Sequence, residues 1–159
     1  MQDYVADELP RWIEAHFPTS DARGVFGHSM GGHGALITAL RNPGRYRSVS
    51  AFSPIIAPAQ VPWGRKAFTA YLGADPEAWR SRDACALLAS ATQRLPLLVD
   101  QGADDPFLDE QLRQQLLQAA CDAAAHPLTL RMHAGYDHSY CFIATFIAEH
   151  IAHHARMLG

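Results

Sequence analysis

A serine stands between two glycines at a spacing suited to nucleophilic catalysis. Residues 27–31 read Gly-His-Ser-Met-Gly and match the pattern G-x-S-x-G. In this pattern the glycines leave room for a sharp turn from strand to helix, so that the serine Oγ projects at the carboxyl end of the sheet. A serine hydroxyl is a weak nucleophile until a neighbouring base takes its proton. The pattern therefore predicts Ser29 as a nucleophile that needs partners.

Two such partners are expected later in the chain. The usual order is serine, then an acid after a later strand, then a histidine. Asp104 and Asp105 follow the apolar run LPLLVDQG, although a solvated acidic turn would account for either aspartate alone. His138 lies in Gly-Tyr-Asp-His-Ser, after the last expected strand and before the last expected helix. The order predicts His138 as the base and one of the two aspartates as the acid.

The remaining histidines and the cysteines are weaker candidates. His28 and His33 flank the serine, where the local backbone is expected to direct their side chains elsewhere, and His133 lies nearer a strand. The histidines of the last helix are expected on a polar face rather than at a metal site: His150, His153 and His154. The cysteines are odd in number and form no C-x-x-C pair, which indicates buried free thiols rather than zinc ligands: Cys85, Cys121 and Cys141.

Strand and helix patterns alternate around these residues. The small or apolar residues after the serine end at Asn42-Pro43-Gly44, which stops a helix. Residues 55–91 are expected to form short helices and loops over the end of the sheet. The other expected elements are a first helix around residues 4–13, strands over 24–26, 46–52, 95–100 and 128–132, and helices over 30–40, 108–123 and 140–157. This alternation favours a mostly parallel α/β sheet in one domain, residues 1–159.

The composition excludes several classes of protein. Hydrophobic residues make up 48% of the chain and charged residues 18%, as in an ordinary globular domain. The net charge is −3 with no basic stripe, which argues against a nucleic-acid partner. The start MQDYVADELP has neither the basic residues nor the apolar run of a signal peptide, and no segment reaches the roughly 18 apolar residues of a membrane span. A soluble, cytoplasmic protein without membrane contact is expected.

The residues of these motifs resemble those of one protein family over about residues 4–158. The chain is similar to S-formylglutathione hydrolase, a serine esterase also called esterase D, in GHSMGGHGAL, NPGRYRSVSAFSPI, PWGRKAF, DQGADDPFL and GYDHSYCFIATFIAEHIAHHA. This resemblance implies an α/β-hydrolase fold with helices on both faces of the sheet. It also implies that Ser29 is the nucleophile, Asp105 the acid and His138 the base. The implied reaction is hydrolysis of S-formylglutathione to glutathione and formate in formaldehyde detoxification, without metal or cofactor.

Other functions on the same scaffold stay open at this point. A general carboxylesterase or acyltransferase would need the same three residues, and a non-catalytic interaction module would need none of them. The wording of PWG and GYDHSY favours the glutathione thioester. Because glutathione is anionic overall, Arg65 and Lys66 beside Trp63 are candidate substrate-binding residues, although a solvent-exposed basic turn would explain them equally well.

The chain departs from the family pattern in two places. Cys141 stands where the family usually has an aromatic residue. Pro106 restricts Asp105 to extended conformations, so Asp104 is the alternative acid.

Members of the family are much longer, and the chain resembles little more than their C-terminal half. This implies an N-terminally truncated domain in which the amide of Met30 supplies one oxyanion donor and an absent segment would supply the other. Losing one such donor costs roughly a hundred- to a thousand-fold in rate, so impaired activity is expected. The strand over 24–26 is expected to be an open sheet edge that a second copy or another partner covers.

Overall fold

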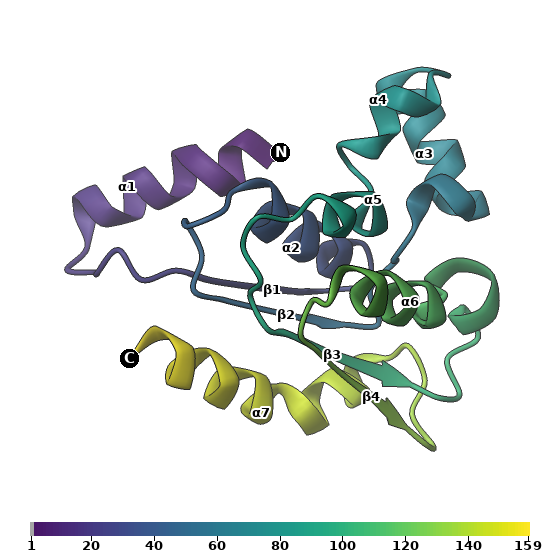
Figure 1. The fold of residues 1–159 in the computed structure, drawn as a ribbon. Coiled ribbons are helices and arrows are strands. Elements are labelled where there is room, and N and C mark those ends of the chain that lie inside the picture. Colours follow the sequence, from purple (N-terminus) through teal and green to yellow (C-terminus); the bar gives the residue numbers. More distant parts are fainter. Residues whose placement is uncertain (1) are drawn as a thin grey trace.

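Four parallel strands form the sheet in the computed structural model, which describes residues 2–159. The strands are β1 (Gly24–His28), β2 (Ser48–Phe52), β3 (Leu97–Gly102) and β4 (Leu128–His133). Their order in the sheet, β1-β2-β3-β4, is their order along the chain, and every neighbouring pair is parallel (Figure 1). The predicted parallel sheet is confirmed, with strand limits shifted by a few residues.

Helices cover both faces of this sheet, as predicted. On one face lie α1 (Leu9–His16), α2 (Met30–Arg41), α5 (Ala84–Ala89) and α6 (Gln114–Ala124), while α7 (Tyr140–Leu158) runs along the opposite face (Figure 1). Among residues 2–159, no helix combines the length and the apolar character that crossing a bilayer requires.

The two faces of β2 differ in chemistry because successive side chains point to opposite sides of a strand. Val49 and Ala51 are fully buried in the main apolar cluster, together with Leu36 of α2 and Leu117 of α6. On the other side, Ser50 and its neighbours face α7. The α2 side of the sheet thus holds the apolar core, and the α7 side holds buried polar groups.

The predicted first helix is present but contains a wider turn. A π-helical turn over Tyr4–Glu8 leads into α1, and Pro10 lies in the first turn of that helix. Proline has no amide hydrogen, so the carbonyl of Ala6 receives no helical bond from it. That carbonyl instead accepts a hydrogen bond from Arg45 Nη2 at 2.5 Å. The irregular turn therefore fixes the helix to the segment before β2.

The single helix expected over residues 108–123 is wrong. A π-helical turn, Leu108–Leu112, is separated from α6 by Arg113, whose φ of 53° is left-handed. The break lets two glutamines make tertiary bonds. Gln111 Oε1 accepts from the amide of Trp63 at 3.0 Å, and Gln114 Nε2 donates to the carbonyl of Pro54 at 2.9 Å. These long-range bonds outweigh the local helical pattern.

Short helices lie over the carboxyl end of the sheet, as expected for residues 55–91. They are a 3-10 turn (Pro58–Gln60), α3 (Pro62–Leu72) and α4 (Pro76–Arg80), after which α5 returns to the face of α2 and α6. Each of the first three has proline in its first turn, where the missing amide hydrogen costs no helical bond. Asp75 and Asp83 cap α4 and α5 by accepting from backbone amides. The segment is therefore ordered by its own local signals.

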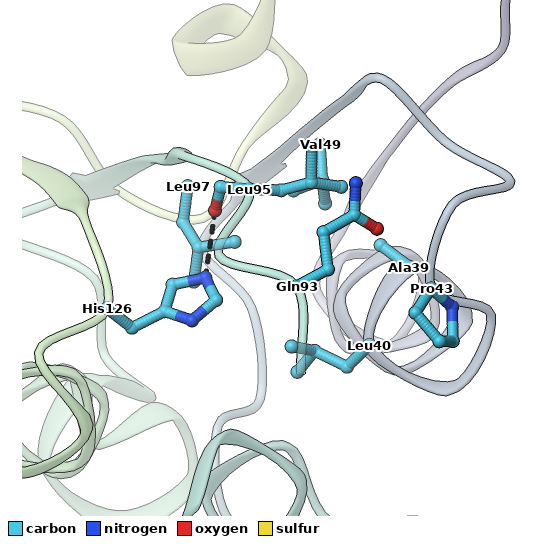
Figure 2. A pocket seen from close by; sticks show the side chains of 8 residues that line it. All are labelled: Ala39, Leu40, Pro43, Val49, Gln93, Leu95, Leu97 and His126. Atoms are coloured by element: carbon cyan, nitrogen blue, oxygen red, sulfur yellow. Dashed lines mark hydrogen bonds between the residues drawn. The ribbon is translucent and has the colours of Figure 1, made fainter. Parts of the chain in front are cut away.

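A small hollow marks the opposite, amino end of the strands. Figure 2 shows its lining, in which His126 Nε2 is bonded to the carbonyl of Leu95 at 2.8 Å. Its volume is about 10 Å³, room for a single water. It is too small for a substrate, so attention turns to the carboxyl end.

Candidate active site

The turn that carries Ser29 joins β1 directly to α2. Ser29 has φ 57° and ψ −117°, a strained conformation for a residue with a side chain. Its amide donates to the carbonyl of Phe52 at 2.9 Å, and its own carbonyl accepts from the amides of His33 and Ile55 at 3.0 and 3.3 Å. These bonds to α2, to β2 and to the segment after β2 hold the strained backbone in place.

The two glycines of the pattern have different roles in this turn. A Cβ on Gly27 would lie 2.3 Å from the carbonyl oxygen of Gly31, so no side chain fits there without moving the backbone. A Cβ on Gly31 itself would meet no atom within 4 Å. Gly27 is therefore required by the turn as it stands, whereas Gly31 is not.

Asp105 and His138 are in direct contact. Asp105 Oδ2 lies 2.6 Å from His138 Nδ1, and the aspartate side chain is fully buried. A Cβ on Gly102, at the end of β3, would lie 2.4 Å from the carbonyl of Tyr136. This close approach brings the loop that carries His138 against the loop that carries Asp105. Asp104 is exposed, so the geometry favours Asp105 as the acid.

Further donors surround the Asp105 carboxylate. The amide of Phe107 donates to Oδ1 at 2.9 Å, across Pro106, and Gln101 Nε2 donates to Oδ2 at 3.1 Å. Burial alone would raise the pKa of Asp105, but the bonds from His138, Phe107 and Gln101 hold that pKa below its usual value. The carboxylate is therefore ionised at neutral pH and accepts from Nδ1 of His138; in a neutral imidazole, a proton held there leaves Nε2 as the acceptor.

The orientation of Gln101 is fixed in turn by Gln114. Gln114 Nε2 donates both to the carbonyl of Pro54 and to Gln101 Oε1, at 2.9 and 2.8 Å. The amide nitrogen of Gln101 consequently faces Asp105.

The ring of His138 is packed between two side chains. His28 lies against it with ring centroids 4.5 Å apart, and Phe107 meets it edge-on at 5.2 Å. The expectation that His28 points elsewhere is wrong, because the end of β1 lies beside the loop of His138. Burial, and then the neighbouring His138, lower the pKa of His28. Within residues 2–159, the side-chain hydrogen bond of His138 is the one to Asp105, and Ser29 Oγ makes none to this ring.

A cavity of about 450 Å³ opens beside Ser29. Its walls come mostly from α2 and α3 and are largely apolar: Ile37, Ile55, Trp63, Phe68, Tyr71 and Leu72. Of the predicted substrate-binding residues, Trp63 lines this cavity and Arg65 and Lys66 do not. Arg65 Nε donates to the carbonyl of Ala59 at 3.0 Å, and Lys66 is exposed on α3. The charged residue in the wall is Arg82, which carried no motif in the sequence.

Met30, the first residue of α2, lies at the mouth of this cavity. Amides in the first turn of a helix have no acceptor within the helix. The Met30 amide accordingly has no acceptor within α2.

Two of the three histidines of α7, His150 and His154, are buried against β2, so the expectation of a polar outer face is wrong for them. His154 Nδ1 lies 2.6 Å from Ser48 Oγ and its Nε2 lies 2.9 Å from Ser50 Oγ. His150 Nδ1 lies 2.9 Å from the same Ser50 oxygen, and its Nε2 is 3.2 Å from Asp100 Oδ2. The sheet thus supplies polar partners for both rings, and burial lowers the pKa of His154 to about 4.

The cysteines differ from one another in exposure. Cys121 is buried and Cys85 half-buried, and burial raises their pKa values to about 11 and about 12. Cys141 is exposed, contrary to expectation, because it lies in the first turn of α7. Within residues 2–159, no three side chains of His, Cys, Asp or Glu are grouped so that they could hold a metal ion.

Known proteins match the whole arrangement. The family described as "Putative esterase" matches residues 1–153. The structure of an S-formylglutathione hydrolase from Agrobacterium tumefaciens is 49% identical, with a TM-score of 0.96 over 100% of this chain and 58% of that one. At 21% identity, the fold is also that of an S-formylglutathione hydrolase from Staphylococcus aureus, with a TM-score of 0.76 over 99% of this chain and 63% of that one.

A ferulic acid esterase has the same fold at 21% identity, with a TM-score of 0.77 over 99% of this chain and 61% of its own. The chain thus spans about three fifths of the length of these relatives. Its fold is that of the α/β-hydrolases, and the chain belongs to the esterase family whose pattern its residues 1–153 match.

Proposed function

We propose that the chain carries the catalytic residues of a serine esterase that hydrolyses S-formylglutathione to glutathione and formate. The observation that carries the proposal is the 2.6 Å contact between His138 Nδ1 and the buried Asp105 carboxylate, beside the strained turn of Ser29. The identity of 49% with the enzyme from Agrobacterium tumefaciens supports the thioester as substrate.

The proposed reaction proceeds through an acyl-enzyme. Ser29 Oγ attacks the formyl carbon while His138 Nε2 takes its proton, and the carbonyl oxygen becomes an oxyanion near the Met30 amide. The carbon–sulfur bond then breaks, and His138 returns the proton to the glutathione thiolate. A water molecule, deprotonated by His138, attacks the formyl-serine and releases formate and the free serine. Asp105 orients His138 and stabilises its imidazolium form throughout.

We propose that Ser29, Asp105 and His138 catalyse this reaction slowly when they act with the Met30 amide alone. One oxyanion donor, the amide of Met30, belongs to the turn of Ser29, and a second donor on another segment would complete the oxyanion hole. The absence of one donor lowers the rate roughly a hundred- to a thousand-fold. We propose that a second copy or another chain covers the open edge of β1, where Phe26 is 47% exposed. A cytoplasmic location fits a substrate built on glutathione.

The apolar cavity favours a second candidate, a general carboxylesterase. A formyl group has no side chain to fill the space bounded by Trp63, Phe68 and Tyr71. Esters with larger apolar acyl groups would fill it and react with the same Ser29.

The test is release of thiol from S-formylglutathione by the purified chain, beside a Ser29→Ala control. Turnover that depends on Ser29 supports the thioesterase, and turnover only of p-nitrophenyl butyrate supports the general carboxylesterase. A fluorophosphonate, which modifies activated serines, provides a second readout where turnover is slow. A folded chain that shows neither turnover nor labelling of Ser29 would contradict catalysis and leave an interaction module.

A further inference from the structure

The cavity beside Ser29 has a charge at one place in an otherwise apolar wall. Its lining includes Ser29 and, on the segment between α4 and α5, Arg82. The same cavity is lined by the apolar side chains of Ile37, Phe68 and Leu72. Arg82 is half-buried at this wall.

This guanidinium has no anionic partner within residues 2–159, where every ion pair involves other cations. The adjacent Asp83 is committed to backbone amides, those of Ala86 at 3.2 Å and Ala59 at 3.4 Å. A second cation, Arg41, is near enough that burial and then the charge of Arg82 lower its pKa. The charge of Arg82 is therefore unbalanced at the cavity.

The backbone of Arg82 is held in a fixed relation to the nucleophile. His33 Nε2 lies 2.9 Å from the carbonyl of Arg82, and the amide of Arg82 donates to the carbonyl of Trp79 at 2.8 Å. His33 is in the first turns of α2, and its amide donates to the carbonyl of Ser29 at 3.0 Å. A single buried imidazole thus connects the backbone of Ser29 to the backbone of Arg82.

We propose that Arg82 binds a carboxylate of the substrate, while an apolar part of the same molecule fills the cavity and its ester or thioester carbonyl reaches Ser29. The proposal rests on the proposed esterase function and narrows its substrate class to carboxylate-bearing esters and thioesters with an apolar spacer. A guanidinium matches a carboxylate through two parallel N–H···O bonds, which a neutral ester end cannot accept as strongly.

The first test measures ligand binding to the Ser29→Ala chain, which lacks the proposed nucleophile and therefore does not hydrolyse the probes. The probes are methyl hydrogen adipate, which has one carboxylate and one ester, and dimethyl adipate, its neutral counterpart. Titrations are followed by ¹H–¹⁵N NMR at neutral pH. A charge-assisted hydrogen-bond pair between the guanidinium and the carboxylate predicts about tenfold tighter binding of the monoanion. Equal affinity for the two probes would overturn the proposal.

Two variants in the same Ser29→Ala background identify the residue responsible. Arg82→Gln is expected to remove the preference for the monoanion and keep the affinity for the diester. Arg80→Gln is the matched control, because Arg80 is exposed on α4 and already lies 3.8 Å from Glu77. Arg82→Lys retains the positive charge and is expected to retain part of the preference. A preference that survives Arg82→Gln, or that is lost equally in Arg80→Gln, would overturn the proposal.

A catalytic comparison separates this proposal from the esterase function itself. The unmodified chain is assayed with p-nitrophenyl hydrogen adipate and p-nitrophenyl hexanoate. A higher kcat/KM for the first that falls in Arg82→Gln supports both proposals. Equal turnover of the two esters supports the esterase and overturns the carboxylate site. Discriminating binding without any turnover supports the carboxylate site and contradicts the esterase.

Discussion

Acidification should destabilise the chain through one imidazole, that of His154 on α7. This side chain is 7% exposed, and its two ring nitrogens lie 2.6 and 2.9 Å from the hydroxyls of Ser48 and Ser50. Burial lowers the pKa of His154 from 6.5 to about 4 in the folded chain. The folded protein thus keeps His154 neutral at pH values where the unfolded chain protonates it.

The direction and size of the effect follow from these two pKa values. The contribution of His154 is fully present above pH 6.5 and is lost as the pH falls from 6.5 to about 4, because the unfolded chain binds the proton first. Each pKa unit corresponds to about 1.36 kcal/mol. Between pH 7 and pH 4.5 the free energy of unfolding should therefore fall by about 2 kcal/mol through His154 alone. The carboxyl of Asp100, with a pKa of about 2, does not titrate in this window.

The assay is urea unfolding followed by circular dichroism at pH 7 and pH 4.5, for the unmodified chain and for His154→Gln. Glutamine can bond to the same hydroxyls but cannot bind a proton in this range. The difference in free energy of unfolding between the unmodified chain and His154→Gln should shrink by about 2 kcal/mol on acidification. The other histidines are common to both proteins and so do not contribute to this difference. The control is His16→Gln, at an exposed site on α1. If the free energy of unfolding of His154→Gln falls between pH 7 and pH 4.5 as much as that of the unmodified chain, the reasoning that His154 is buried in its neutral form is refuted.

Two further predictions concern the catalytic loops. Asp105→Asn should lower the rate of serine-dependent turnover or fluorophosphonate labelling about ten-thousand-fold, because His138 loses the partner of its Nδ1 proton. Asp104→Asn, at the exposed neighbour, should change the same rate little, and a larger loss there would reverse the assignment of the acid. Gly27→Ala should lower the urea midpoint strongly because its Cβ would lie 2.3 Å from the Gly31 carbonyl, whereas Gly31→Ala should fold like the original chain. Equal midpoints for these two alanine variants would contradict the geometry of the turn.

The sequence predicted those features that have a local signal. The run before Ser29, the small residues after it and the stop at Asn42-Pro43-Gly44 together place the turn between β1 and α2. Alternating patterns likewise predicted the parallel sheet, because each strand is followed by its own helical or loop segment along the chain, whereas the edge position of the first strand followed from the family resemblance.

Features that depend on distant partners were missed. The polar partners of His150 and His154 lie on β2, about a hundred positions earlier in the chain. Because the spacing within α7 contains no sign of these partners, it predicts a polar outer face. The apolar stripe continues through Arg113, although long-range bonds of the glutamines on either side break the helix there. Arg82 belongs to a segment without any period, and only the fold brings it to the cavity of Ser29.

The bonds behind Asp105 have a fixed direction. The backbone of Pro54 offers only a carbonyl, so Gln114 must present its nitrogen there, and the same nitrogen can only donate to the oxygen of Gln101. Gln101 is then left with its own nitrogen toward the Asp105 carboxylate. The donor and acceptor in each of these hydrogen bonds are thus determined by the carbonyl of Pro54, which lies just after β2. The substitution Gln114→Leu would leave Gln101 Oε1 without its donor, and so loosen the amide that donates to Asp105 without touching either residue of the Asp105–His138 pair.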